Sequence, residues 1–264
     1  MSFGRSLKEL VSLKGKTALV TGSASGIGEA IACRFAEAGA FLELVDIDEE
    51  RLEKMCAVKG LKETARLYRV DLSSKSAIDA LWSKLEGHEP DILVNNAGIY
   101  PMRGFLDVDE GFLNKVMEVN LKSVVWMCQH MIRARAKKGG VIVNIGSIEA
   151  IMPFKEEMAH YDVSKAGVIA LTRALAKEYG RKGFRVNALL PGGIMTPGVK
   201  NVAKEIAKLK LGIIKDGIEF RGRLPLGRFG KPDEVALMAL VLASDASSYV
   251  QGALIPVDGG FLSA

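Results

Sequence analysis

The strongest constraint on the fold is an alternation, repeated along the chain, of short apolar runs with longer stretches of helical periodicity. This alternation is typical of a parallel β-sheet that is covered by helices on both faces. Strands are predicted over residues 17–21, 41–46, 66–71, 92–95, 140–145, 185–190 and 253–257. Helices are predicted over, among others, residues 27–38, 49–58, 75–85, 109–137, 158–180 and 232–243. The pattern predicts an α/β fold in three layers (α/β/α), with a doubly wound, seven-stranded parallel sheet of the Rossmann type.

No linker, repeat or low-complexity tract divides the chain, so we interpret residues 1–264 as a single domain. Residues 192–226 interrupt the alternation between two predicted strands and carry short apolar patches. Insertions of this kind usually form loops or lids over a substrate, so a substrate-loop insertion is predicted here. A plain pair of surface helices is the alternative.

Composition argues against several classes of function. The 264 residues are 48% hydrophobic and 25% charged, as in ordinary globular proteins. No apolar run reaches the roughly 18 residues of a membrane span, and the first residues lack the apolar segment of a signal peptide. The net charge of +5 is mild, and no basic run is interleaved with aromatic residues, so we expect no nucleic-acid partner. Separated cysteines and scattered histidines predict reduced thiols, a cytoplasmic location and no metal site.

The first predicted strand runs directly into a glycine-rich turn with the spacing Gly22-x3-Gly26-x-Gly28, and a helix follows. Glycines let the backbone approach a pyrophosphate, and unpaired N–H groups at the helix N-terminus meet its negative charge. The spacing differs from the Gly-x-Gly-x2-Gly of the general dinucleotide fingerprint. The turn still predicts a nucleotide site, in which Ser25 and Ile27 lie beside the glycines.

The second predicted strand ends at Asp46, where dinucleotide-binding proteins carry an acidic residue about 20 positions after the glycines. An acid here can accept hydrogen bonds from both ribose hydroxyls of the adenosine and repels a 2′-phosphate. Neither Ser25 nor Ile47 offers a cation to such a phosphate, so NAD is predicted in preference to NADP. The alternative is that Asp46 only caps the following segment, with Asp48 as the competing acid.

Two further strand ends are predicted to lie along the cofactor, because ligands of doubly wound sheets bind at the carboxyl ends of the strands. Asp71, with Leu72 beside it, is predicted to accept a hydrogen bond from the adenine amino group, and a helix N-cap is its alternative role. Asn96, Ala97 and Gly98 follow the fourth strand. Those three residues could equally form only a strand-ending turn.

Tyr161 and Lys165 are four residues apart, so on a helix the phenol and the ammonium share one face. A tyrosine ordinarily ionises near pH ~10, and a nearby ammonium favours the phenolate. A lowered pKa would make Tyr161 a general acid or base at neutral pH. The alternative is a solvated tyrosine–lysine pair on an ordinary amphipathic helix.

Taken in order, these motifs resemble those of the short-chain dehydrogenase/reductase family, in its compact single-domain branch. The resemblance extends from residue 13 to Gly260, essentially the whole chain. It implies a reversible hydride transfer between NAD(H) and a secondary alcohol or ketone, and a homotetramer. The matching motifs are Thr21-Gly22-x3-Gly26-x-Gly28, Asn95-Asn96-Ala97-Gly98, Asn120, Ser147, Tyr161-x3-Lys165 and Pro191-Gly192-x3-Thr196.

The resemblance implies a role for each catalytic position. Ser147 follows a strand, and its hydroxyl would polarise the substrate oxygen as charge builds there. Tyr161 would pass the proton, and Lys165 would hold the phenolate and the nicotinamide ribose. Asn120 would bend its helix and hold a water that links Lys165 to solvent. A polar residue on a wet face is the alternative for Asn120.

The resemblance also implies that Pro191, Gly192, Ile194 and Thr196 hold the nicotinamide carboxamide, although Thr196 could instead cap the next helix. The interval between the serine and the tyrosine is fourteen residues, one more than is usual in the family. The extra residue predicts a bulge within residues 153–158.

Glu149 and His160 are the predicted substrate residues, because a site built to bond hydroxyl groups discriminates strongly for them. Together they favour a sugar or polyol, unless the two side chains are solvated or make a subunit contact. The apolar segment 206–214 favours instead a 3-oxoacyl-(acyl-carrier-protein) reductase, whose acidic carrier would meet the cations at residues 133–138. Those cations could also simply complement a helix end. A non-catalytic nucleotide sensor or scaffold, and an epimerase or dehydratase, are further alternatives.

Overall fold

The computed structural model of the protein describes residues 4–196 and 220–264. These residues form a seven-stranded parallel sheet with the strand order β3-β2-β1-β4-β5-β6-β7. The strands are β1 (Thr17–Thr21), β2 (Phe41–Asp46), β3 (Ala65–Arg69), β4 (Ile92–Asn95), β5 (Gly140–Ile145), β6 (Phe184–Pro191) and β7 (Leu254–Val257). The predicted doubly wound α/β sheet is therefore confirmed.

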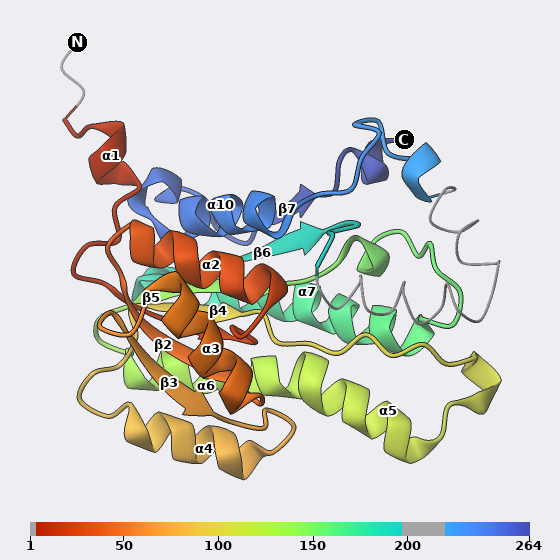
Figure 1. Ribbon diagram of the computed structural model, residues 1–264, viewed down its shortest axis with the longest axis horizontal. Coiled ribbons are helices and arrows are strands. Elements are labelled where there is room, and N and C mark those ends of the chain that lie inside the picture. Colours follow the sequence, from red (N-terminus) through yellow and green to blue (C-terminus); the bar gives the residue numbers. More distant parts are fainter. Residues whose placement is uncertain (1–3, 197–219) are drawn as a thin grey trace.

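Helices cover both faces of this sheet and give the three predicted layers (Figure 1). The α-helices of the described residues are α1 (Leu7–Leu10), α2 (Gly26–Glu37), α3 (Glu49–Lys59), α4 (Lys75–Lys84), α5 (Glu110–Met117), α6 (Ser123–Ala134), α7 (Ala159–Tyr179) and α10 (Pro232–Ala243). One apolar core packs α2, α3 and α10 on one face, and a second core packs α4, α6 and α7 on the other. None of these helices is both long and apolar enough to cross a membrane.

Local sequence signals explain where several helices begin. Asp48, Ser74 and Asp109 are the N-caps of α3, α4 and α5, and each side chain accepts a hydrogen bond from a backbone N–H of the first turn. Such caps satisfy donors that a helix cannot pair internally. Pro232 starts α10, where its missing N–H removes no helical hydrogen bond.

Three elements differ from the sequence prediction. Strand β3 ends at Arg69, so Asp71 lies beyond the strand and not at its last position. The single helix predicted over residues 109–137 is α5 and α6, joined by a π-helical turn, Glu118–Lys122. The short helix α1 was not predicted, because one turn carries too little periodicity to be recognised.

The sheet has its switch point between β1 and β4, where the chain changes from adding strands on one side to adding them on the other. All seven strands run in the same direction, so their carboxyl ends lie along one edge. Ligands of doubly wound sheets bind at this edge, beside the switch point. Thr21, Asp46, Asn95 and Pro191 end their strands here.

A buried polar network fixes α7 to the middle of the sheet. Asn95 Nδ2 donates to Asn144 Oδ1 at 2.8 Å, and Asn144 Nδ2 donates to Thr172 Oγ1 at 2.9 Å. All three side chains are almost fully buried. Buried amides are costly unless paired, so the network favours one position of α7 over others.

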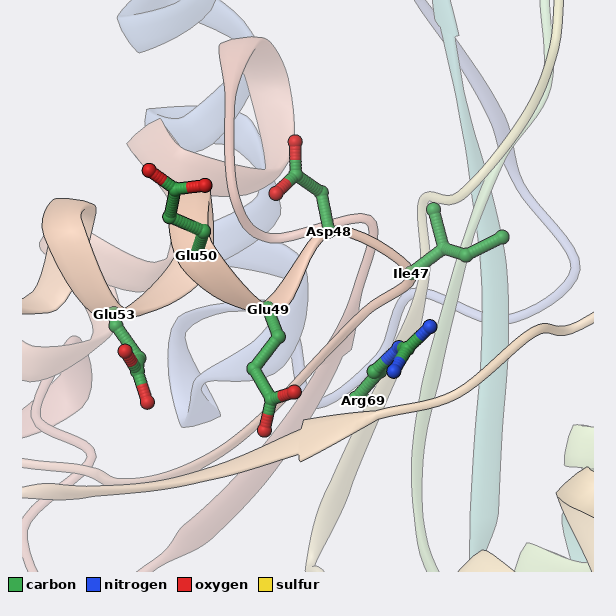
Figure 2. Close-up of a pocket in the computed structure, with 6 residues that line it drawn as sticks. All are labelled: Ile47, Asp48, Glu49, Glu50, Glu53 and Arg69. Atoms are coloured by element: carbon green, nitrogen blue, oxygen red, sulfur yellow. The ribbon is translucent and has the colours of Figure 1, made fainter.

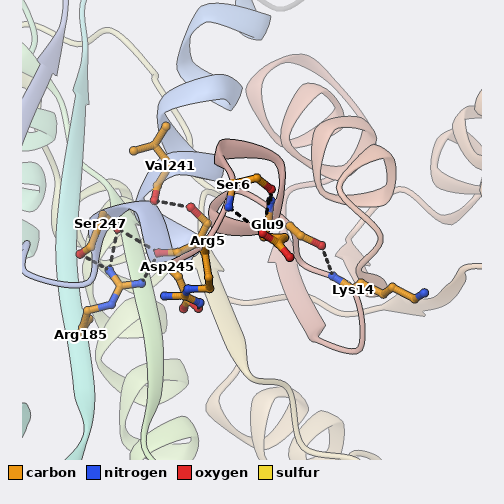
Figure 3. A network of polar contacts seen from close by, with 10 residues as sticks. Arg5, Ser6, Glu9, Lys14, Arg185, Val241, Asp245 and Ser247 are labelled. Atoms are coloured by element: carbon orange, nitrogen blue, oxygen red, sulfur yellow. Dashed lines mark hydrogen bonds and ion pairs between the residues drawn. The ribbon is translucent and has the colours of Figure 1, made fainter. Parts of the chain in front are cut away.

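The N-terminal segment contacts the turn that follows α10 through Arg5 (Figure 3). Ser6 and Glu9 form a reciprocal capping box at the start of α1. Arg5 pairs with Asp245 at 2.6 Å, although both side chains are largely exposed and such pairs contribute little. Behind them Arg185 Nη1 donates to Ser247 Oγ at 2.9 Å and thereby joins β6 to the same corner.

Candidate active site

The glycine-rich turn after β1 is tightly packed. A Cβ atom on Gly28 would lie 2.1 Å from the carbonyl oxygen of Gly22, so only glycine fits there. Gly22 and Gly26 have φ values of 64° and 62°, which glycine adopts without strain. Ser25, the N-cap of α2, makes no side-chain capping hydrogen bond, and Ile27 lies in the first turn of α2. The N–H groups of that turn can therefore meet a pyrophosphate.

Hydrogen bonds between the ends of β1 and β4 hold this turn in place. The Thr21 hydroxyl accepts hydrogen bonds from the N–H groups of Asn96 and Ala97, both at 3.0 Å. Asn96 Nδ2 donates to the carbonyl oxygens of Thr21 and Gly22, at 2.9 and 3.0 Å. The Asn96 side chain thus shapes the turn directly. Thr21 was part of a matching motif, but the role of its hydroxyl was not predicted.

Asp46 also braces the glycine-rich turn. Its carboxylate accepts hydrogen bonds from Ala24 N at 2.8 Å and from Asp48 N at 3.1 Å. The alternative that Asp46 caps α3 is wrong, because Asp48 does so by accepting from Arg51 N at 3.0 Å. The contact of Asp46 with a ribose stays a prediction.

A pocket opens just beyond Asp46, at the start of α3 (Figure 2). Four of its side chains are carboxylates, Arg69 comes from the end of β3, and the Ile47 side chain is exposed. It lies beside β2 and β3, and β2 is three strands from β5, the strand that Ser147 follows. Its lining residues are Ile47, Asp48, Glu49, Glu50, Glu53 and Arg69.

Asp71 does not cap a helix, because Ser74 is the N-cap of α4. Its Oδ1 accepts hydrogen bonds from Ser73 N at 2.9 Å and Ser73 Oγ at 2.7 Å, and these bonds lower the pKa of Asp71. Leu72 is buried in the core beside it. The carboxylate therefore stays ionised and can accept a further donor such as an adenine amino group.

The segment after β6 returns to the glycine-rich turn. Gly192, which follows Pro191, donates its N–H to Val257 O at 3.0 Å. Ile194 pairs with Gly230 in an isolated β-bridge. A Cβ on Gly26 would lie 3.3 Å from Thr196 Cγ2, so Thr196 faces the pyrophosphate turn. Residues 197–219 of the predicted insertion, and with them the apolar segment 206–214, lie outside the described residues, whereas residues 220–226 are described.

Ser147, Tyr161 and Lys165 converge at the end of β5. Ser147 is buried and is separated from the end of β5 by one glycine. It is the N-cap of the short 3-10 turn Ile148–Ala150. Lys165 Nζ donates to Ile145 O at 2.8 Å and lies 5.8 Å from the centre of the Tyr161 ring. Tyr100, which the sequence analysis missed, packs edge-on against Tyr161 at 4.8 Å between ring centres.

The predicted lowering of the tyrosine pKa is wrong for this structure. Burial raises the pKa of Tyr161 to about 12, and the charges of Glu149 and Asp162 add to the increase. Hydrogen bonding with Ser147 acts in the opposite direction but does not offset the burial. Burial also lowers the pKa of Lys165 to about 8. Sharing a helix face with Lys165 is therefore not enough to lower the pKa of Tyr161, because desolvation disfavours the charged form of both groups.

Asn120 lies in the π-helical turn and is completely buried, so the wet-face alternative is wrong. Its amide accepts from Ile99 N at 2.8 Å and donates to Ile99 O at 2.9 Å and Ser164 Oγ at 3.3 Å. A Cβ on Gly98 would lie 3.3 Å from Asn120 Oδ1 and 3.5 Å from Lys165 Nζ. The π-helical turn thus places the Asn120 amide close to Lys165 Nζ. The water that Asn120 would hold between Lys165 and solvent stays a prediction.

Glu149 and His160, the predicted substrate residues, are not solvated: their side chains are 7% and 4% exposed. Glu149 Oε2 accepts a hydrogen bond from Phe154 N at 2.9 Å. His160 Nε2 bonds Pro101 O at 2.8 Å, and its ring packs edge-on against Phe112. Both therefore bond to loop backbones close to Ser147 and Tyr161, and direct contact with a substrate stays a prediction.

The bulge expected from the long serine–tyrosine interval is centred on Glu157. This residue has a φ of 63°, the one positive value among the non-glycine residues that the structure describes. Its carbonyl oxygen accepts a hydrogen bond from Arg103 N at 3.1 Å. Glu157 thus ties the loop before α7 to the segment after β4. A left-handed conformation at a non-glycine residue stores strain, which functional sites often do.

Comparisons with known proteins agree with this geometry. The sequence profile of a family described as "Enoyl-(Acyl carrier protein) reductase" matches residues 22–262. The chain is 37% identical to 3-oxoacyl-[acyl-carrier-protein] reductase of Thermotoga maritima over 254 residues, 95% of this chain and 99% of that protein. It is also 37% identical to galactitol 2-dehydrogenase (L-tagatose-forming) of Cereibacter sphaeroides over 252 residues, 94% and 96% of the two chains.

A solved structure adds a bound ligand to the comparison. L-sorbose reductase from Gluconobacter frateurii, complexed with NADPH and L-sorbose, superposes with a TM-score of 0.88 at 32% identity. The superposition covers 97% of this chain and 99% of that one. The family profile, the relatives and the fold agree, and the chain therefore belongs to the short-chain dehydrogenase/reductase family of NAD(P)-dependent oxidoreductases.

Proposed function

We propose that the protein transfers hydride reversibly between NAD(H) and a secondary alcohol or ketone, and that the substrate is a sugar or polyol. The observation that carries the reaction is the convergence of Ser147, Tyr161 and Lys165 at the carboxyl end of β5, one strand from the switch point. The sugar or polyol is supported by the relatives.

Each catalytic residue has a task in this reaction. Ser147 would donate a hydrogen bond to the substrate oxygen and stabilise its developing charge. Tyr161 would take the hydroxyl proton in oxidation and return it in reduction. Lys165 and Asn120 would carry that proton onward through water. When bound, the nicotinamide supplies the hydride acceptor.

Tyr161 needs help to ionise, because its surroundings raise its pKa to about 12. A cation within a few ångströms favours a phenolate. Lys165 Nζ is bound to Ile145 O and could supply that cation by turning toward the phenol. The positive charge of an oxidised nicotinamide acts in the same direction, so we expect Tyr161 to deprotonate more easily with NAD bound than without it.

The proposed preference for NAD is supported by charge at the adenosine end. Asp46 ends β2, and the pocket beyond it holds four carboxylates and one guanidinium. This surrounding is unfavourable for a 2′-phosphate. The bound NADPH of L-sorbose reductase shows that such a fold also accommodates NADP, so the ratio must be measured.

The second candidate, a 3-oxoacyl-(acyl-carrier-protein) reductase, is favoured by the Thermotoga relative. Docking of a carrier protein on the cations at residues 133–138 is not supported. Arg135 is committed to Gly139 O and Asp91, at 2.7 and 2.8 Å. These cations also lie where β5 begins, whereas Ser147 lies where it ends, about 20 Å away along six residues.

Initial rates of NAD and NADP reduction over polyols, aldoses and simple alcohols test the proposal. The reverse reaction of a β-keto thioester with NADH and NADPH tests the second candidate. Tyr161→Phe should abolish turnover, while Tyr100→Phe, which keeps a ring beside Tyr161, should retain it. Equal losses in the two variants would contradict the assigned role. Tight NADH binding without turnover on any substrate would favour the sensor.

The cofactor preference has its own test. Asp46→Asn should lower the ratio of kcat/KM for NAD to that for NADP at least about tenfold, since an ionic repulsion is removed. Glu50→Gln, which removes an exposed charge from the same pocket, is the control. A wild type that prefers NADP would overturn the prediction.

We also propose a homotetramer in the cytoplasm. Phe105, Leu106 and Val163 are 73%, 96% and 60% exposed, and such apolar side chains support a subunit interface. Light scattering coupled to size exclusion tests this, and a monomer would contradict it.

A further inference from the structure

The backbone of Glu149 forms a hydrogen bond with the side chain of Ser147. It lies two residues after Ser147, and its N–H donates to Ser147 Oγ at 3.2 Å. The side chain is 7% exposed, which is rare for a glutamate. A buried carboxylate needs hydrogen-bond donors to offset its lost hydration.

The carboxylate finds those donors in the following loop. Its Oε2 accepts from Phe154 N at 2.9 Å and lies 3.5 Å from Lys155 N. Phe154 in turn packs edge-on against Phe220 and Phe261, with ring centres 5.1 and 5.6 Å apart. Glu149 therefore folds residues 151–157 back over the turn that carries Ser147.

The folded loop reaches the catalytic tyrosine through one aromatic side chain. Lys155 Nζ lies 5.8 Å above the ring of Tyr100, and Tyr100 packs edge-on against Tyr161 at 4.8 Å. The carbonyl of Glu157 accepts from Arg103 N, which ties the end of the loop to the segment after Tyr100. The position of the loop thus determines the surroundings of Tyr161.

We propose that Glu149 is a positioning residue, whose carboxylate holds the loop 151–157 against Tyr100 and so orders the substrate side of the site around Tyr161. This inference rests on the proposed function, in which Tyr161 moves the proton. It assigns Glu149 a task different from binding substrate hydroxyls, because one of its oxygens is already occupied by the backbone of the loop.

Hydrogen–deuterium exchange of a peptide spanning Phe154 and Lys155 tests the inference without any turnover. Glu149→Ala should speed exchange at these amides about tenfold or more, because it removes a charged acceptor. Glu149→Gln keeps an acceptor oxygen at the same position and should change exchange less than about threefold. Glu156→Ala, an exposed carboxylate of the same loop, is the control. Unchanged exchange in Glu149→Ala would overturn the inference.

Should Glu149→Ala fail to fold, Glu149→Asp replaces it. Its carboxylate is one methylene short of the amides, so exchange should again accelerate. These measurements remain informative even if no substrate is found, which separates this inference from the proposed function.

Kinetics separate positioning from substrate binding. Glu149→Ala should raise KM about tenfold or more, whereas Glu149→Gln should keep KM within about threefold. The inference would be overturned if Glu149→Ala and Glu149→Gln raised KM equally while the amides of Phe154 and Lys155 stayed protected from exchange in Glu149→Gln. The charge of Glu149 would then bind the substrate.

The pH profile of alcohol oxidation gives a second kinetic readout. The groups around Tyr161 are Ser147 and Glu149 after β5, Asp162 and Lys165 on α7, and Tyr100 after β4. The charge of Glu149 raises the pKa of Tyr161, so Glu149→Gln should move the midpoint of kcat/KM toward lower pH by about half a unit or more. An unmoved midpoint would contradict a carboxylate held beside Tyr161.

Discussion

Asp162 directly follows Tyr161, and we predict that its charge destabilises the fold at neutral pH. Burial, and then the charge of Glu149, raise the pKa of Asp162 from 3.8 to about 6, while His160 acts against the shift. Oδ1 is buried without a hydrogen-bond partner among the described residues. The first turn of a helix ordinarily favours a carboxylate. Desolvation outweighs that benefit here.

The shift converts into a stability difference with a definite sign. The folded state holds the proton of Asp162 more tightly than the unfolded state, so this group favours folding below about pH 4 and opposes it above about pH 6. A shift of about two units corresponds to about 3 kcal/mol. Because the side chain is only partly buried, solvent screening reduces the expected effect to about 1–2 kcal/mol.

Replacing Asp162 with asparagine keeps the shape and removes the charge. Urea unfolding should show Asp162→Asn more stable than the wild type by about 1–2 kcal/mol at pH 7.5, with the difference vanishing near pH 4. In the background of Glu149→Gln the gain should be smaller, since the repelling charge is absent. Asp107→Asn, at an exposed acid, is the control. A gain that is absent at pH 7.5, or equal at both pH values, would refute the reasoning.

Three further predictions concern the packing of the site. Gly28→Ala should destabilise the protein by about 2–4 kcal/mol and abolish NADH binding by fluorescence, because its Cβ meets a carbonyl oxygen at 2.1 Å. Gly60→Ala, left-handed but in open space, should cost only about 1 kcal/mol, and equal effects would contradict the steric argument. Asn120→Leu should cost about 2–4 kcal/mol in urea unfolding, because it leaves the N–H and C=O of Ile99 unpaired; a near-neutral result would refute this. Glu157→Gly should be neutral or stabilising by up to about 1 kcal/mol, and a loss of thermal stability would show that its left-handed φ of 63° is unstrained.

The sequence by itself determined the architecture and the positions of the chemical groups. The strand–turn–helix pattern around Gly22 and Gly28, and the alternation of apolar and helical segments, depend on local periodicity and short spacings that are visible in one dimension. The same holds for the acid at the end of β2 and for the placing of Ser147 after β5. Parallel strands must share one edge, so these groups were bound to lie along the same edge of the sheet.

Only the tertiary structure decided how those groups behave. The spacing of Tyr161 and Lys165 predicts a lowered tyrosine pKa, yet burial by distant elements raises it. Asn120 reads as a polar residue in a helix, and only the contacts with Ile99 show a buried amide. Glu149 reads as a substrate ligand, and only the fold reveals its hydrogen bond to the loop. Desolvation and hydrogen-bond pairing depend on which segments pack together, and that information is not contained in the spacing of residues along one element.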